Sequence, residues 1–361
     1  MLTLALVVGT RPEAIKLAPV YRALEHAGAR PVVVLTGQHE ALLDPLIQLF
    51  GFDRRIDLGA RRPGDSLADF TARATARLAE MFAAEHFSAV IVQGDTSSAL
   101  AGALAASYAC LPLAHVEAGL RSGDLANPFP EEIHRRRIAE TARWHFAPTP
   151  IAAANLAAER RGGEVHLVGN PVVDSALWVA GLPGTREIVA RRFPGLTDRP
   201  HLLVTAHRRE SFGRPMRAIA AAIAAIARRL PDHELIVALH PNPNASAPLA
   251  ERLCGLSNVE LTEPLSYPLT IGLVAKASMV LTDSGGLQEE APSFGVPVLV
   301  LRKVTERPEG IAAGCSRIAG TSTRAILTAF DAWRGEGPRC AAANPYGDGH
   351  SGERIARILL A

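Results

Sequence analysis

Short runs of apolar residues alternate along the chain with longer stretches in which apolar residues recur every three or four positions. Such short continuous runs are typical of strands buried on both faces, and the longer spacing is typical of amphipathic helices. In the first half, strands are predicted at 2–8, 31–35, 89–93, 113–116, 145–147 and 165–168, and helices at 12–26, 41–50, 67–85, 97–108, 131–142 and 151–160. This alternation predicts a parallel sheet covered by helices.

Turn signals then interrupt the pattern, with Gly-Asn-Pro at 169–171, Gly-Leu-Pro-Gly at 181–184 and Pro-Gly at 194–195. A second alternation follows, with strands predicted at 201–205, 234–238, 259–262, 279–282 and 296–301, and helices at 216–230, 247–253, 267–275, 287–294 and 323–333.

We therefore predict an α/β chain of two doubly wound, Rossmann-like domains, 1–170 and 171–361, whose last helix can cross back to the first domain. Ligands of such folds bind at the carboxyl ends of the strands, and here we also expect binding in the cleft between the domains.

Composition narrows the possible partners of the chain. Of 361 residues, 48% are hydrophobic and 20% are charged, which predicts a globular protein and excludes disorder. Lys and Arg total 38 against 36 Asp and Glu, so the net charge is only +2. Nucleic-acid and membrane-surface proteins normally carry a basic stripe, so neither partner is expected.

The apolar run near the start of the chain is only about seven residues long and is read as a buried strand, not as a signal peptide. No stretch approaches the roughly 18 apolar residues of a membrane span. The four cysteines, Cys110, Cys254, Cys315 and Cys340, form no CxxC pair. We expect an intracellular protein with reduced thiols, no structural metal and no cofactor.

Polar residues gather directly after the predicted strands. After the first strand, Thr10 and Glu13 fit a capping box and Pro12 fits the first helical turn, which explains these three residues without any function. That explanation does not extend to Arg11 or Lys16. Cations beside the exposed amides of a helix start suit a phosphate group.

Three carboxylates follow later strands of the first half. Asp95 follows the third strand and is explained equally well as a helix N-cap. Glu117 follows the fourth strand, and packing does not readily explain it. Glu131 starts a helix and shares a face with Arg135, so these two residues can simply form an ion pair.

In the second half, the loop that starts at His207 adds Arg208, Arg209 and Glu210, which suggests an anion site or, alternatively, a surface cluster of salt bridges. His240 lies in a similar but weaker His-Pro-Asn-Pro sequence, whose prolines can serve only to shape a turn.

The strongest local signal is Asp-Ser-Gly-Gly at 283–286, where two glycines precede a helix. Bare amides at a helix start form a phosphate cradle. The pattern is neither GxGxxG nor Walker A, so no dinucleotide or Walker-type binding is predicted. Glu289 and Glu290 can complement the helix dipole, and Arg307 adds a cation after the next strand.

Together these blocks resemble the non-hydrolysing UDP-N-acetylglucosamine 2-epimerases. Nine blocks occur in order: GTRPEAIK at 9–16, GQH at 37–39, QGDTSS at 93–98, HVEAGLRSGD at 115–124, PEE at 130–132, HRRESFG at 207–213, DSGGLQEEAPSFG at 283–295, TERPE at 305–309 and NPYGDG at 344–349. The resemblance implies a GT-B-like fold, a cytoplasmic homodimer, a UDP-sugar substrate and a place in polysaccharide or aminosugar biosynthesis.

The resemblance also implies roles for individual residues. It places Lys16, Asp95, Glu117, Glu131 and His207 in catalysis, and it assigns substrate binding to Arg11, Arg135, Ser284, Gly285, Gly286, Glu290 and Arg307. Members of the family often bind a second substrate molecule as an activator, and the corresponding candidates here are Gln38, His39, Arg208, Arg209 and His240.

The family chemistry accounts for these residue types. The hydrogen on C2 of an N-acetylhexosamine has no neighbouring carbonyl, so the family eliminates UDP to give a glycal and adds it back with the opposite configuration. This route needs an acid, a base and cations for the departing diphosphate. Crowded carboxylates have separated pKa values, which lets one act as acid and another as base, and the order is left open. We also expect domain closure to retain the glycal.

The sequence departs from the family pattern in two places. Leu265 stands where a glutamine commonly contacts the uracil, no phenylalanine follows Tyr267, and Thr270 completes the altered stretch. Ala41 stands where a second glutamine is often found near the activator. The alternatives are a GT-B glycosyltransferase, a hydrolysing 2-epimerase that releases free N-acetylmannosamine and UDP, and an inactive nucleotide-sugar sensor.

Overall fold

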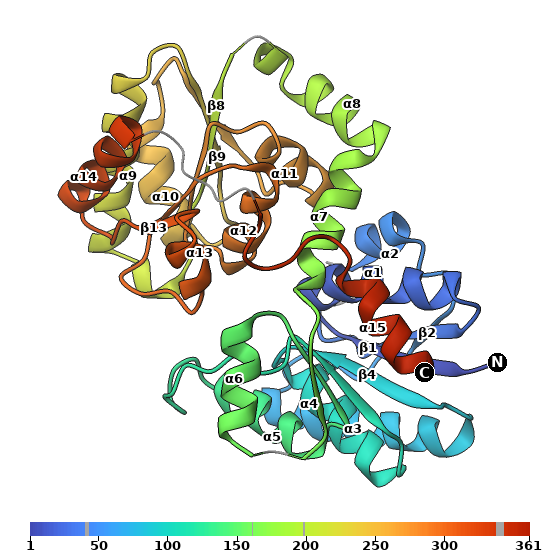
Figure 1. The fold of residues 1–361 in the computed structure, drawn as a ribbon. Coiled ribbons are helices and arrows are strands. Elements are labelled where there is room, and N and C mark those ends of the chain that lie inside the picture. Colours follow the sequence, from blue (N-terminus) through green and yellow to red (C-terminus); the bar gives the residue numbers. More distant parts are fainter. Residues whose placement is uncertain (40–42, 161, 198, 337–342) are drawn as a thin grey trace. The chain divides into compact units, whose positions relative to one another are not determined.

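The computed structural model describes residues 1–39, 43–160, 162–197, 199–336 and 343–361, with only the backbone described at 197, 335 and 336 (Figure 1). The chain divides into two compact units. The first comprises Met1–Ser175 together with Gly347–Ala361, and the second comprises Ala176–Tyr346.

The first unit is built on a parallel sheet of seven strands in the order β3-β2-β1-β4-β5-β6-β7. The strands are β1 (Thr3–Val8), β2 (Arg30–Leu35), β3 (Arg55–Asp57), β4 (Ala89–Gln93), β5 (Leu113–Val116), β6 (Trp144–Ala147) and β7 (Glu164–Leu167). In β1, β4 and β5 nearly every side chain is buried, as expected for strands covered on both faces. These three strands are neighbours, so the loops at their carboxyl ends meet at one edge of the sheet.

Helices connect these strands. They are α1 (Arg11–His26), α2 (Asp44–Phe50), α3 (Leu67–Ala84), α4 (Ser97–Tyr108), α5 (Glu131–Thr141) and α6 (Pro150–Ala158). The predicted capping box of Thr10 and Glu13 is confirmed at the start of α1. A second capping box, of Ser66 and Asp69, starts α3.

The second unit contains a parallel sheet of six strands in the order β10-β9-β8-β11-β12-β13. The strands are β8 (His201–Thr205), β9 (Glu234–Ala238), β10 (Val259–Thr262), β11 (Met279–Thr282), β12 (Val298–Val300) and β13 (Ser316–Ile318). The helices are α8 (Pro183–Arg192), α9 (Arg214–Arg229), α10 (Pro243–Leu253), α11 (Tyr267–Val274), α12 (Gly285–Glu290), α13 (Pro308–Ala312) and α14 (Thr323–Glu336). Its largest core cluster joins α9 to the strands through residues such as Ile219, Ile223 and Val237.

Helix α7 (Pro171–Gly181) begins in the first unit and ends in the second, and the last helix, α15 (Ser351–Leu360), returns to the first unit (Figure 1). A Cβ atom at Gly352 would lie 2.6 Å from the backbone of Pro19, so α15 packs closely on α1. The backbone amide of Gly352 also donates a 2.8 Å hydrogen bond to Asp174 Oδ1.

The strand predictions are confirmed to within two residues wherever a strand is predicted, but the stretch of turn signals at 169–195 is largely helical. That stretch contains both α7 and α8, because Pro171 and Pro183 occupy first helical turns, where proline fits, and do not prevent helix formation. The predicted helix at 41–50 starts at Asp44 in the structure, and residues 40–42 lie outside the described residues.

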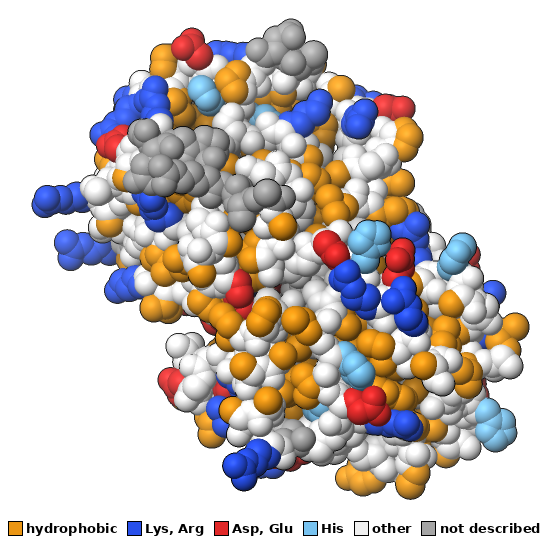
Figure 2. Space-filling view, in the orientation of Figure 1, with side chains coloured by type: hydrophobic (Ala, Val, Ile, Leu, Met, Phe, Trp, Pro, Cys, Tyr) orange, Lys and Arg blue, Asp and Glu red, His pale blue; other side chains and the backbone are white. Residues whose placement is uncertain are grey.

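Among the described residues, no helix is both long and apolar enough to cross a membrane. The face shown in Figure 2 carries Lys and Arg side chains interspersed with Asp and Glu. That pattern agrees with the near-neutral charge of the whole sequence.

Candidate active site

Glu117 lies at the carboxyl end of β5, in a pocket of hydrogen-bond donors. Its Oε1 is 2.5 Å from Lys16 Nζ of α1, and its side chain is almost fully buried. Gln93, the last residue of β4, donates its side-chain amide to Oε2, and Asn170 Nδ2 donates to Oε1 at 3.1 Å. Three donors from three segments therefore fix the orientation of this carboxylate.

The backbone of Glu117 has a φ of +63°, a left-handed conformation that is unusual for a residue other than glycine. Such a conformation costs roughly 1 kcal/mol or more and persists where the surroundings hold it in place, often at a functional site. The prediction that packing does not explain Glu117 agrees with this geometry.

Asp95, in the loop after β4, binds Arg135 of α5 through two guanidinium nitrogens, with Nε at 3.1 Å. The N-cap interpretation of Asp95 is wrong, because Thr96 caps α4 by accepting a 3.0 Å hydrogen bond from the Ala99 amide. The carboxylate of Asp95 is therefore not used to cap α4 and is available to the candidate active site.

The ion pair predicted between Glu131 and Arg135 does not form. Arg135 instead bridges Asp95 and Glu132, with Nη1 lying 3.2 Å from Glu132 Oε2. Within the described part of the chain, Glu131 makes no hydrogen bond or ion pair and is half-buried. Burial alone would raise the pKa of Glu132, but the Ser122 amide and the guanidinium groups of Arg136 and Arg135 hold it below its ordinary value.

Arg11, at the same edge of the sheet, forms no contact that stabilises the fold through its charge within the described residues. It is half-buried at the start of α1 and makes no hydrogen bond or ion pair within the described residues. A guanidinium held in this way is available to an anion. Gln38, one of the activator candidates, accepts hydrogen bonds from the amide and hydroxyl of Ser98, at 3.2 and 2.6 Å, and His39 is exposed.

In the second unit, His207 follows β8 and lies against Asp283 at the end of β11. The fully buried Asp283 accepts the backbone amides of His207 and Arg208 at Oδ2, at 2.7 and 2.8 Å. Its Oδ1 is 3.2 Å from His207 Nδ1. Burial lowers the pKa of His207 below its ordinary value, and the Asp283 carboxylate opposes that effect. The ring of His240 stacks on His207 with centroids 5.5 Å apart.

The salt-bridge interpretation of this loop holds for Glu210, and also for His207 when its ring is protonated beside Asp283. Glu210 binds Arg302 at 2.8 Å, whereas Arg208 donates from Nε to the Asp283 carbonyl at 3.3 Å. Arg209 is exposed.

The glycine-rich turn begins α12, with Ser284 as its N-cap residue. A Cβ atom on Gly285 would lie 2.6 Å from Arg307 Cζ, so only glycine lets this guanidinium lie against the backbone. Arg307 Nε is held 2.7 Å from Glu289 Oε1. Glu290 accepts a 3.0 Å hydrogen bond from the hydroxyl of Tyr267.

Sequence reasoning missed three residues of these clusters. Gln93 and Asn170 carry no charge and lie far apart in the sequence, so no local pattern marks them. Asp283 belongs to the Asp-Ser-Gly-Gly sequence, and its position directly after a buried strand is the signal that marks it as a candidate site residue.

Two parallel Rossmann-like sheets, with carboxylates and cations at their carboxyl edges, define an α/β enzyme fold of the GT-B-like class. A family model described as UDP-N-acetylglucosamine 2-epimerase matches residues 22–360. The chain therefore belongs to the UDP-N-acetylglucosamine 2-epimerase family, which confirms the predicted resemblance and the predicted enzyme class.

Curated relatives and solved structures agree with that assignment. The chain is 40% identical to the UDP-N-acetylglucosamine 2-epimerases of Yersinia pestis and Escherichia coli K12, over 98% of its length and 97% of theirs. The Neisseria meningitidis UDP-GlcNAc 2-epimerase bound to UDP-GlcNAc has 37% identity, full coverage of both chains and a TM-score of 0.91. The Methanocaldococcus jannaschii enzyme in complex with UDP-GlcNAc and UDP has 31% identity, 99% coverage of both chains and a TM-score of 0.83.

Proposed function

We propose that this chain interconverts UDP-N-acetylglucosamine and UDP-N-acetylmannosamine by eliminating UDP across C1 and C2 and adding it back to the glycal. The observation that carries the proposal is the pair of carboxylates, Glu117 and Asp95, each held by a cation at neighbouring strand ends of one sheet. Relatives of similar length that bind UDP-GlcNAc support the choice of substrate.

In this proposal, the carboxylates of the first unit exchange the C2 proton. Glu117, hydrogen-bonded to Lys16, and Asp95, bound to Arg135, supply two positioned groups that can serve as acid and base. Glu131 is a third, unpaired carboxylate on the first turn of α5 within the described residues. Which group acts in which direction is left to the experiment.

Cations and amides stabilise the departing diphosphate. Arg11 offers an unused guanidinium in the first unit. In the second unit, His207, Arg307 and the amides at 284–286 form the proposed diphosphate site, because cations and helix-start amides favour phosphate charge. Glu290, positioned by Tyr267, is the proposed ribose contact. Leu265 is half-buried and offers the base no hydrogen bond from its side chain.

The proposed function is tested by following UDP-N-acetylglucosamine with the purified chain by NMR and by chromatography of the nucleotide. The expected result is an equilibrium mixture of the two UDP-sugars without net release of UDP. Stoichiometric free N-acetylmannosamine and UDP would instead indicate the hydrolysing reaction, and tight UDP binding without turnover would indicate a sensor. A transferase would leave the sugar unchanged until an acceptor is added.

A homodimer and a cytoplasmic location also belong to the proposal. Cys110 and Cys254 are exposed free thiols, which agrees with a reducing compartment, and Cys340 lies outside the described residues.

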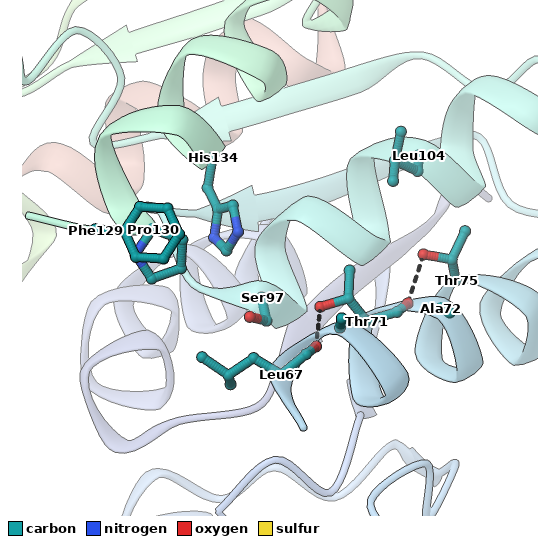
Figure 3. A pocket seen from close by; sticks show the side chains of 10 residues that line it. Leu67, Thr71, Ala72, Thr75, Ser97, Leu104, Phe129, Pro130 and His134 are labelled. Carbon is teal, nitrogen blue, oxygen red and sulfur yellow. Dashed lines mark hydrogen bonds between the residues drawn. The ribbon is translucent and has the colours of Figure 1, made fainter. Parts of the chain in front are cut away.

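The proposed dimer contact is a groove of about 600 Å³ over α3, α4 and the start of α5 (Figure 3). It is lined by Leu67, Ala68, Thr71, Ala72, Thr75, Ser97, Leu104, Phe129, Pro130 and His134.

Two hydroxyl groups that line this groove have hydrogen-bond partners within the protein and do not depend on water. The hydroxyls of Thr71 and Thr75 donate to backbone carbonyls of their own helix, at 2.7 and 2.8 Å, as the dashed lines of Figure 3 show. Phe129, at 69% exposed, stands at the rim of the groove. Such a face is suited to packing against a second copy of itself.

Light scattering tests this contact with L104E and, as its control, L167E, which changes an exposed leucine on the edge strand β7. We expect L104E to be monomeric and L167E to stay dimeric. A wild-type monomer, or an L104E dimer, would contradict this part of the proposal.

A further inference from the structure

Glu13 is completely buried between two loops of the first unit and contacts both of them. On the β1–α1 loop, its Oε2 accepts the amides of Gly9 and Thr10 at 2.9 and 2.6 Å and the Thr10 hydroxyl at 2.9 Å. On the β4–α4 loop, the hydroxyl of Thr96 donates to Oε1 at 2.5 Å. The two carboxylate oxygens therefore serve two different loops.

A capping box alone does not require this arrangement. In the capping box of α3, Asp69 binds the amide and hydroxyl of Ser66, at 3.2 and 2.6 Å, and the side chains stay exposed. Burying a carboxylate completely is costly unless it is fully hydrogen-bonded. The burial of Glu13 and its bond to Thr96 are thus features beyond helix capping.

A residue of the proposed active site lies directly beside each of the two contacts with Glu13, one at the start of α1 and one on the β4–α4 loop. Arg11 follows Thr10, and Asp95 precedes Thr96. The two loops are also packed tightly at a neighbouring point, because a Cβ atom on Gly9 would lie 1.9 Å from Ser98 Oγ. The separation between the loops is therefore set by direct contact and by the carboxylate between them.

We propose that Glu13 is a positioning residue for the epimerase reaction, whose carboxylate joins the start of α1, where Arg11 lies, to the loop of Asp95 through Thr96. The inference rests on the proposed function, since that function makes the placement of Arg11 and Asp95 matter. Glu13 has no exposed surface, so it acts through these loops without touching the substrate. A displacement of about 1 Å in a reacting group costs up to roughly 100-fold in rate.

The test separates the bond to Glu13 from helix capping, because Thr96 does both. T96V removes the hydroxyl that binds Glu13 and also the cap of α4. T149V removes the cap of a different helix, α6, where Thr149 accepts the Ala152 amide at 3.2 Å. T96S keeps a hydroxyl for both contacts and serves as the conservative variant.

We expect T96V to lower kcat about tenfold or more, with a smaller change in KM, because the reacting groups move while the diphosphate contacts of the second unit remain. T96S should restore most of the turnover, and T149V should lose a similar amount of stability while keeping kcat. An unchanged kcat in T96V, or an equal loss of kcat in T149V, would overturn the inference.

Wild-type turnover is measured first, so that the two proposals can fail separately. Absence of interconversion by the wild type refutes the proposed function, and with it this inference. Normal wild-type interconversion with normal kcat in T96V refutes the positioning role of Glu13 alone.

Discussion

The buried carboxyl of Glu13 makes the stability of the protein depend on pH in a way that a single substitution removes. Burial raises the pKa of Glu13 from 4.5 to about 7, although the hydrogen bonds from Thr96, Gly9 and Thr10 oppose the shift. Between these two pH values, the folded protein holds a proton that the unfolded chain has released. The stabilisation is therefore complete below pH 4.5 and is lost as the pH rises through 7.

The magnitude follows from the size of that shift. At about 1.36 kcal/mol per pH unit, a difference between 4.5 and about 7 corresponds to roughly 3 kcal/mol in total. Most of it, about 2 to 3 kcal/mol, falls between pH 5 and pH 8. The amide of E13Q does not titrate, so the stability of the wild type relative to E13Q should fall by about this amount from pH 5 to pH 8.

Urea unfolding followed by circular dichroism at pH 5, 6, 7 and 8 measures this difference. D69N is the matched control, because it makes the same chemical change in the exposed capping box of α3. It should not reproduce the loss. A wild-type advantage over E13Q that stays constant with pH, or that grows as the pH rises, would refute the reasoning.

Two further predictions concern the proposed site. E117Q and D95N should each lower kcat by about 100-fold or more. UDP binding measured by calorimetry should change little, because neither carboxylate belongs to the proposed diphosphate site. Near-normal turnover in either variant would remove that residue from the mechanism. G285A should weaken UDP binding by about tenfold or more, because its Cβ atom would displace the Arg307 guanidinium. The control is G195A, because a Cβ atom at that position meets nothing within 4 Å. Equal UDP affinities in the two variants would contradict the role of Gly285.

Much of the fold could be predicted because its central strands are buried on both faces and appear as continuous apolar runs. The strands β3 and β13 were missed because each has only three residues and lies at the edge of its sheet, where charged residues such as Arg55 and Arg317 are tolerated. Helices α7 and α8 were missed because a proline in a first helical turn looks the same in sequence as a proline that ends an element.

Site residues could be predicted where local structure, such as helix capping, did not explain them. Their hydrogen-bond and ion-pair partners could not be predicted where those partners come from distant segments of the chain. Helical spacing predicted Glu131 as the partner of Arg135, but Arg135 binds the neighbouring Glu132 and Asp95. Asp95 lies 40 residues earlier and is brought close by the parallel sheet. Gln93 and Asn170 reach Glu117 in the same way. Only the three-dimensional structure shows that the Glu13 carboxylate extends beyond its capping box to Thr96.

The central claim is that positioned carboxylates remove and restore the proton on C2 of a UDP-sugar. The most direct measurement is NMR of UDP-N-acetylglucosamine incubated with the protein in deuterated water. The account predicts that both epimers accumulate and that deuterium replaces hydrogen at C2 of the product. Epimerisation with the original hydrogen retained at C2 would contradict it.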